Sequence, residues 1–218
     1  MKEKLSPWEK AYRKVKCLWG LKPEPMLMEY SRIIPKGYVL DLGIGEGRNS
    51  LTFAELGYQV EGFDISSTAI KHCIETAKKA NLKIKAKVGN LKNITITKEK
   101  YTLIIAAWVL NFFKKADIAK IITRIRKGVK KNGFVYISVF SLDDPGYRKA
   151  KDKFKEIETN TFYLPKRDYF THYFTKNEIL SLFDILKVIY CAEGTELDME
   201  HGEPHNHGFI IYLGQKVK

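Results

Sequence analysis

Cysteine is scarce in this chain of 218 residues. The three that occur, Cys17, Cys73 and Cys191, are odd in number and far apart in the sequence. Disulfide frameworks and thiolate zinc sites both depend on cysteines at regular, usually close spacings. We therefore expect neither a disulfide framework nor a cysteine-bound metal to hold this fold together.

Long apolar runs are missing as well. No stretch approaches the roughly 20 residues that a helix needs to cross a bilayer, and the first residues, MKEKLSPWEK, lack the apolar core of a signal peptide. We therefore expect a cytoplasmic protein with no membrane partner. A length of 218 residues, of which 44% are hydrophobic, suits one α/β domain with a sizeable core.

Acidic residues are outnumbered by basic ones. Lys and Arg total 38 against 25 Asp and Glu, which gives a formal net charge of +13. Such an excess is typical of proteins that contact phosphate groups. The lysines are nevertheless scattered over nearly every expected helix, a distribution more typical of a solvated surface. Nucleic acid is thus an alternative partner that we do not favour, and no oligomeric state is predicted.

The most informative stretch runs from Val39 to Ser50 and reads VLDLGIGEGRNS. An apolar segment is followed by three glycines at alternate positions and then by apolar residues at helical spacing. This order predicts a buried strand, a tight turn and a helix. Glycine lets the backbone adopt positive φ and approach a ligand closely, and a helix start offers unpaired N–H groups. We therefore expect a nucleotide-like cofactor at this turn.

A second signal follows about 20 residues further on, where an apolar run that begins at Tyr58 ends at Asp64. A carboxylate at such a strand tip can accept both hydroxyls of a ribose. The position at which a dinucleotide fingerprint would have its third glycine is occupied by Arg48. A nicotinamide-dependent oxidoreductase is therefore a less favoured enzyme class.

Strands and helices alternate along most of the chain. After Asp64 we expect strands over 82–88, 101–107, 134–140, 185–192 and 207–213, helices over 67–80, 114–127 and 175–183, and a polar loop over 193–206. This rhythm predicts an α/β fold with a doubly wound, Rossmann-like sheet of seven mostly parallel strands and an antiparallel last strand. Helices are expected on both faces.

We expect a single domain over residues 1–218. Residues 1–36 are interpreted as a helical lid, with an amphipathic helix from Pro7 to Gly20 and a second helix to about Ile34. Packing of the aromatic face of the first helix against the core is the alternative. Residues 143–172 mix charges and aromatic side chains without a clear period, and we interpret them as a substrate-side insertion.

Several stretches together resemble the class I S-adenosylmethionine-dependent methyltransferases, and most of all the tellurite-resistance methyltransferase family. The resemblance extends from about Tyr38 to the C-terminus. It rests on the glycine stretch together with GRNSLTFAELGYQVEGFDIS, AAWVLNFF, KKNGFVYISV and FTKNEILSLF. It implies a methyltransferase domain with S-adenosylmethionine as its cofactor.

The resemblance also implies roles for individual residues. The backbone around Asp41, Leu42 and Gly43 would hold the methionine part of the cofactor, and Asp64 the ribose hydroxyls. Asn90, where the superfamily more often has Asp, would bind the adenine edge. Arg48 can pair with the methionine carboxylate or with a nearby acid. The implied cofactor-binding residues are Asp41, Gly43, Gly45, Gly47, Arg48, Asp64, Ile65, Asn90, Leu91 and Ala106.

The segment Ala106-Ala107-Trp108-Val109 carries neither the proline-rich aromatic tetrapeptide of base-amine methyltransferases nor the cysteine beside a proline of many cytosine-C5 enzymes. We therefore expect a small-molecule acceptor, an oxyanion such as tellurite or selenite or else a thiol. An RNA methyltransferase is the alternative. Residues that could line an acceptor pocket, each singly more typical of core or rim, are Trp108, Asn111, Phe112, Tyr147, Arg148 and Tyr173.

Histidines gather near the C-terminus in the segment HGEPHNHGF. The tellurite-resistance proteins resemble this region in placing His and Arg near the cofactor methyl group, but the arginines are missing here, which weighs against tellurite itself. The catalytic candidates are His201, His205 and His207. We favour a substrate-facing role over an exposed loop or a metal site, and we assign no metal ligand.

Overall fold

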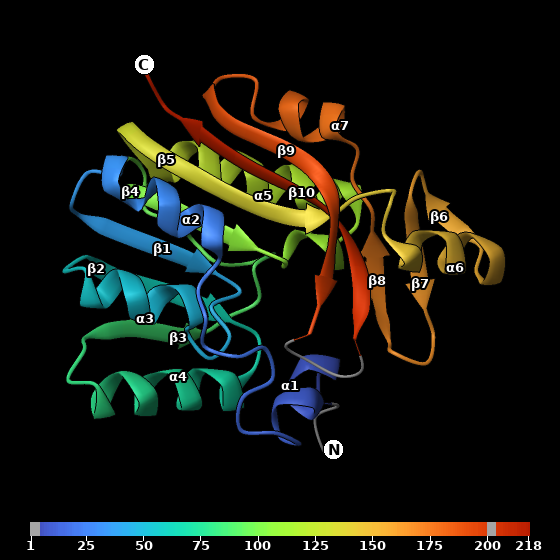
Figure 1. Cartoon of the computed structure of the whole chain (residues 1–218), viewed down its shortest axis with the longest axis horizontal. Helices are drawn as coiled ribbons and strands as arrows, with labels where there is room; N and C mark the ends of the chain where they lie inside the picture. Colours follow the sequence, from blue (N-terminus) through green and yellow to red (C-terminus); the bar gives the residue numbers. More distant parts are fainter. Residues whose placement is uncertain (1–4, 200–203) are drawn as a thin grey trace.

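The computed structural model describes residues 5–199 and 204–218, which fold around a seven-stranded sheet (Figure 1). Its strands are β1 (Tyr38–Leu42), β2 (Gln59–Asp64), β3 (Ile84–Val88), β4 (Tyr101–Ala107), β5 (Val129–Phe140), β9 (Lys187–Asp198) and β10 (His205–Gln215). Their order is β3-β2-β1-β4-β5-β10-β9, and β10 runs antiparallel to both of its neighbours. The predicted fold class is therefore confirmed.

Helices cover both faces of this sheet (Figure 1). They are α1 (Pro7–Tyr12), α2 (Pro25–Tyr30), η1 (Ser31–Ile33), α3 (Arg48–Glu55), α4 (Ser67–Lys79), η2 (Leu110–Phe112), α5 (Lys115–Gly128), α6 (Pro145–Lys153) and α7 (Lys176–Leu182). Within the described ranges, no helix is long and apolar enough to cross a membrane.

The central strand β4 contributes to two separate hydrophobic clusters. Its Ile104 packs in the cluster that contains Ile122 of α5, and its Leu103 packs in the cluster that contains Phe53 of α3. Successive side chains of a strand point to opposite faces of the sheet. A strand covered on both faces has no solvent side, which explains the nearly unbroken apolar sequence of β4.

The segment 143–172 forms α6 and a second, antiparallel sheet of three strands. These strands are β6 (Glu156–Glu158), β7 (Thr161–Leu164) and β8 (Tyr169–His172). The sequence predicted an insertion here but not this sheet, because short strands of mixed charge and aromatic composition have no clear periodicity.

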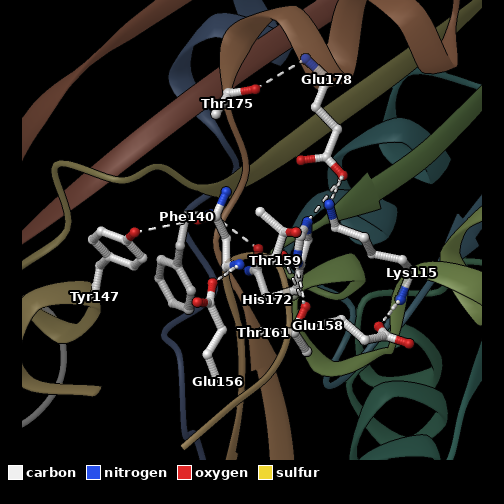
Figure 2. Close-up of polar contacts among 12 residues, drawn as sticks. Lys115, Phe140, Tyr147, Glu156, Glu158, Thr159, Thr161, His172, Thr175 and Glu178 are labelled. Atoms are coloured by element: carbon white, nitrogen blue, oxygen red, sulfur yellow. Dashed lines mark hydrogen bonds and ion pairs between the residues drawn. The ribbon is translucent and has the colours of Figure 1, made fainter. Parts of the chain in front are cut away.

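Figure 2 shows how the small sheet is anchored to the helices through His172 of β8. The side chain of His172 is completely buried, with its Nδ1 2.8 Å from Thr161 Oγ1 of β7 and its Nε2 3.1 Å from Glu178 Oε1 of α7. Lys115 Nζ of α5 lies 3.8 Å from the same carboxylate. Thr175 caps α7, since its hydroxyl accepts the Glu178 N–H at 3.1 Å.

The helix predicted from Pro7 to Gly20 is too long, because α1 ends at Tyr12. The N–H of Leu18 donates to Glu46 Oε2 at 2.7 Å. The Leu18 N–H thus bonds to a distant side chain and not to a carbonyl of a helix, which the spacing of aromatic residues had predicted here.

The polar loop predicted over 193–206 is wrong at both of its ends. Strand β9 continues to Asp198, and β10 begins at His205. Because β9 is the outer strand of the sheet, part of its surface faces water, and its backbone bonds to β10 hold polar residues in the strand. The fifth strand likewise begins earlier than expected, at Val129.

Candidate functional site

A cavity of about 920 Å³ lies at the carboxyl ends of β1, β2, β3 and β4. Ligands of parallel α/β sheets bind at this edge, where the strand order reverses between β1 and β4. The cofactor residues predicted from the sequence that line this cavity are Asp41, Gly43, Gly45, Arg48, Asp64, Ile65, Asn90 and Leu91.

Two predicted cofactor residues lie elsewhere. Gly47 is the N-cap of α3 with a φ of 92°; a Cβ there would lie 2.8 Å from Cys73 Sγ, so this glycine serves the packing of α3 on α4. Ala106 is fully buried within β4, and it is the next residue, Ala107, that lines the cavity. The alternation of side chains along β4 explains this shift by one position.

The floor of the cavity is the turn between β1 and α3. Gly43 and Gly45 have φ angles of 76° and 54°, a region that side chains with a Cβ rarely adopt. An added Cβ on Gly43 would lie 2.6 Å from Val109 Cγ2, and one on Gly45 would lie 2.7 Å from the Tyr12 hydroxyl. Backbone therefore forms this surface, and any larger residue would fill space at the cavity wall.

Asp64 stands at the tip of β2 with 8% of its surface exposed. The Gly45 N–H donates to its Oδ2 at 3.0 Å and the Ser66 N–H to its Oδ1 at 2.8 Å. Burial raises the pKa of Asp64 to about 6, although these N–H donors favour the ionised form. An ionised carboxylate has about four acceptor positions, so this one is fixed in orientation and can still accept from a ligand.

Asp41 on β1 is buried beside the same turn. Ser50 Oγ of α3 donates to its Oδ2 at 2.8 Å. Burial raises the pKa of Asp41 to about 7, an effect only partly offset by the Ser50 hydrogen bond and the charge of Arg48. A cation bound in the cavity would favour the ionised form, because an opposite charge nearby compensates the lost hydration.

Glu24 is a buried residue of the site that sequence reasoning missed. It pairs with Arg48, and its carboxylate accepts from Trp108 Nε1 at 3.0 Å and from the Tyr136 hydroxyl at 3.1 Å. Its N–H donates to Asn49 Oδ1 at 2.9 Å. Of the two partners considered for Arg48, the structure shows the nearby acid, Glu24. The partners of Glu24 lie up to 112 residues away from it in the sequence, so no local pattern could reveal them.

Aromatic rings from three distant segments meet over the cavity. Trp8 of α1 stacks on Tyr169 of β8, with ring centroids 5.5 Å apart and planes 13° apart, and it meets Phe112 edge-on.

Glu9 fixes α1 to the start of α4, where its carboxylate accepts from the Ser66 and Thr68 hydroxyls at 2.7 Å. Burial would raise the pKa of Glu9, but the hydrogen bonds that its carboxylate accepts lower the pKa to about 2.

The opposite wall carries His207, one of the three candidate histidines. The ring of His207 stacks on Phe140 with centroids 5.2 Å apart, and its Nδ1 donates to Asp144 Oδ2 at 3.0 Å. The ring centroids of His205 and His207 lie 4.6 Å apart. Of these two histidines, His207 lines the cavity. The third candidate, His201, lies outside the described residues.

The cavity is acidic although the whole chain is basic. The described residues that line it include seven acids and three lysine or arginine side chains. The acids are Glu24, Asp41, Glu46, Asp64, Asp168, Glu196 and Asp198. In a partly desolvated site this excess favours a cationic ligand and opposes a polyanionic one.

A model of one protein family matches residues 24–169, the family described as tellurite resistance protein TehB. The chain belongs to the TehB family. The probable S-adenosyl-L-methionine-dependent methyltransferase TehB of Haemophilus influenzae (strain ATCC 51907 / DSM 11121 / KW20 / Rd) is 31% identical over 119 residues, which are 54% of this chain and 41% of that protein. The chain thus matches about two fifths of the length of this TehB relative.

Solved structures have the same fold. A SAM-dependent methyltransferase from Methanosarcina mazei superposes with a TM-score of 0.75 at 21% identity, over 90% of this chain and 99% of that one. TehB from Haemophilus influenzae superposes with a TM-score of 0.70 at 23% identity, over 88% of this chain and 62% of that one. The TehB family match ends at residue 169, before the β9–β10 hairpin that carries His205 and His207.

Two of the predicted acceptor-pocket residues, Trp108 and Phe112, line the cavity. Asn111 is buried beneath it, and its Oδ1 accepts the Phe140 N–H at 2.9 Å. In the described part of the chain, the others lie away from the cavity wall. Tyr147 and Tyr173 pack in a separate hydrophobic cluster, and Arg148 belongs to α6.

Replacement of Asp41 by asparagine is expected to stabilise the ligand-free protein at pH 8 by a few degrees in Tm. Since the pKa of Asp41 is raised to about 7 from 3.8, the carboxyl favours folding below pH 4 and opposes it increasingly as pH rises to 7. Asparagine cannot ionise and can still accept from Ser50. Thermal melting at pH 5 and pH 8 measures the difference, which should grow with pH.

Asp152, an exposed aspartate of α6, provides the matched control for this comparison. Asp152→Asn should change Tm by the same small amount at both pH values. An Asp41→Asn variant that is no more stable than the wild type at pH 8 would contradict the assignment of a buried, destabilising charge.

Proposed function

We propose that this chain is an S-adenosylmethionine-dependent methyltransferase that acts on a small-molecule acceptor. The observation that carries the proposal is the acidic cavity at the tips of β1 and β2 in a chain whose net charge is +13. The sulfonium and ammonium groups of the cofactor are cations that acidic walls attract. The two phosphates of a nicotinamide cofactor would face the same carboxylates, which disfavours an oxidoreductase.

Particular residues of the cavity fit this cofactor. Asp64 would accept the ribose hydroxyls, and Asp41 would attract the ammonium group. The bare backbone at Gly43 and Gly45 provides room that a Cβ would fill. Asn90 and the half-exposed side chain of Ile65 line the part of the cavity beside β3, where they would contact adenine.

The chain contributes alignment more than proton transfer. When bound, the cofactor supplies a methyl group on a positively charged sulfur, and displacement from such a group depends on the placement of the acceptor atom. We propose that residues 1–36 act as a lid, in which Trp8 of α1 excludes water by stacking on Tyr169 of the insertion. Glu9 would hold the lid in place through Ser66 and Thr68.

The acceptor that we propose is an oxyanion such as tellurite or selenite, or a thiol. It would enter between the aromatic side chains and the β9–β10 hairpin, where Trp108, Phe140 and His207 line the cavity. Nucleophiles of this kind are anionic or become so readily, and they need no strong general base. This fits the described wall of the cavity, which offers His207 and no buried lysine or cysteine.

Calorimetric titration with S-adenosylhomocysteine tests the first part of the proposal. One molecule should bind per chain, and a nicotinamide dinucleotide should not bind. Absence of S-adenosylhomocysteine binding would overturn the proposal. A panel of tellurite, selenite, thiols and RNA, assayed for formation of S-adenosylhomocysteine, then identifies the acceptor; turnover with RNA alone would overturn the small-molecule assignment.

A further inference from the structure

Three side chains of the metal-binding types gather on one face of the β9–β10 hairpin. His205 is paired directly opposite Asp198, and His207 follows His205 by two residues. Side chains two apart on a strand share a face, and directly opposed residues have Cβ atoms about 5 Å apart. One donor atom from each of the three lies within 4.8 Å of the other two.

A hydrogen bond to Asp144 fixes the orientation of the His207 ring. Asp144 Oδ2 accepts from its Nδ1 at 3.0 Å, while its Nε2 lies 3.8 Å from Asp198 Oδ2. Metal-binding histidines typically have this arrangement, in which a carboxylate holds one ring nitrogen and directs the other toward the ion. The stacking of the ring on Phe140 restricts it further.

The position of the cluster leaves it accessible to a dissolved ion. The side chains of His207 and Asp198 are each 19% exposed, and both residues also line the large cavity. An ion could therefore reach the cluster from solvent, and once bound it would lie beside the acceptor region of the cavity.

We propose that Asp198, His205 and His207 bind one divalent transition-metal ion, represented by Zn²⁺. Two imidazoles and one carboxylate are a donor set of zinc sites that keep a coordination position open. Asp144 would act as the positioning residue that holds His207. Metal binding does not depend on the proposed function.

A consequence that does rest on the proposed function concerns the acceptor. The open coordination position would bind a thiol or an oxyanion at the cavity edge. A thiol that coordinates the ion releases its proton to solvent and remains there as the thiolate, so the acceptor would be held as an anion in spite of the acidic walls.

Metal titration of the full chain, purified without a histidine tag and stripped with a chelator, tests the proposal. Co²⁺ should produce visible absorption bands with one ion bound per chain, and Zn²⁺ should displace it. His205→Ala and Asp198→Asn should each weaken Zn²⁺ binding by about 100-fold or more, and Asp144→Asn by about 10-fold. His72→Ala, which alters a histidine of α4 outside the cavity wall, is the matched control and should bind Zn²⁺ like the wild type.

Binding of S-adenosylhomocysteine to the stripped protein separates this inference from the proposed function. If the cofactor product binds but no stoichiometric metal does, or if His205→Ala binds Zn²⁺ as tightly as the wild type, the metal site is overturned and the methyltransferase proposal stands. If the metal binds and the cofactor product does not, the proposed function fails and the metal site stands.

Discussion

Replacement of Asp64 by alanine is expected to weaken binding of S-adenosylhomocysteine by about 100-fold or more. On the proposed function this carboxylate accepts the ribose hydroxyls, and a hydrogen bond to a charged group contributes about 1.5–3 kcal/mol. Two such bonds correspond to at least two powers of ten in Kd, because about 1.4 kcal/mol is a factor of ten. Calorimetry at pH 8 measures the loss.

Glu61 provides the matched control for this experiment. It is a carboxylate of the same strand, ion-paired with Lys100 at 2.7 Å and absent from the wall of the cavity. Glu61→Ala should bind S-adenosylhomocysteine as the wild type does. Binding by Asp64→Ala within threefold of the wild type would remove Asp64 from the site.

The affinity of the wild type should also fall in acid. Burial raises the pKa of Asp64 to about 6 and that of Asp41 to about 7, and in both cases the ionised form is the one that would bind the cofactor. As pH drops through this range, both groups gain a proton and lose attraction for the ligand. Calorimetry between pH 8 and pH 5 should show a rising Kd, and a constant Kd would contradict this assignment.

Replacement of His172 by alanine is expected to lower the free energy of unfolding by about 3 kcal/mol. The variant loses a completely buried ring and leaves Thr161 and Glu178 without the partner that joins β7, β8 and α7 (Figure 2). For a chain of this length, such a loss lowers Tm by about 6–12 °C. Urea unfolding measures the free energy directly.

Lys115→Met serves as the comparison. It removes only the partly exposed ammonium group 3.8 Å from Glu178 and keeps the aliphatic part of the side chain. We expect a change within about 0.5 kcal/mol. If His172→Ala were as stable as Lys115→Met, the buried histidine would not anchor the insertion.

Local patterns predicted the elements that are formed by neighbouring residues. The glycine spacing, the apolar run before it and the helical spacing after it predicted β1, the turn and α3, because strand burial, positive φ and helix periodicity are each encoded within a few residues. Asp64 was identified in the same way, as the polar residue that ends an apolar strand. The antiparallel last strand was predicted from two strand patterns joined by a polar loop, which is typical of a hairpin-like return.

The parts of the site that were missed depend on contacts between distant segments. Glu24 is an ordinary acidic residue between two prolines, and its pairing with Arg48 and Tyr136 exists only after α2, α3 and β5 have packed together. The strand content of residues 193–198 was missed for a related reason. Its polar composition suggested a loop, whereas the hydrogen bonds from β10 decide its conformation.

The sequence by itself determined the Rossmann-like order of elements, the glycine turn and the carboxylate of Asp64 beside it, since these depend on periodicity and backbone freedom. Only the tertiary structure decided that acids converge on a cavity in a basic protein, and that the register of β9 against β10 places Asp198 opposite His205. Register is set by backbone pairing across the hairpin, and a shift of one residue would turn these side chains to opposite faces.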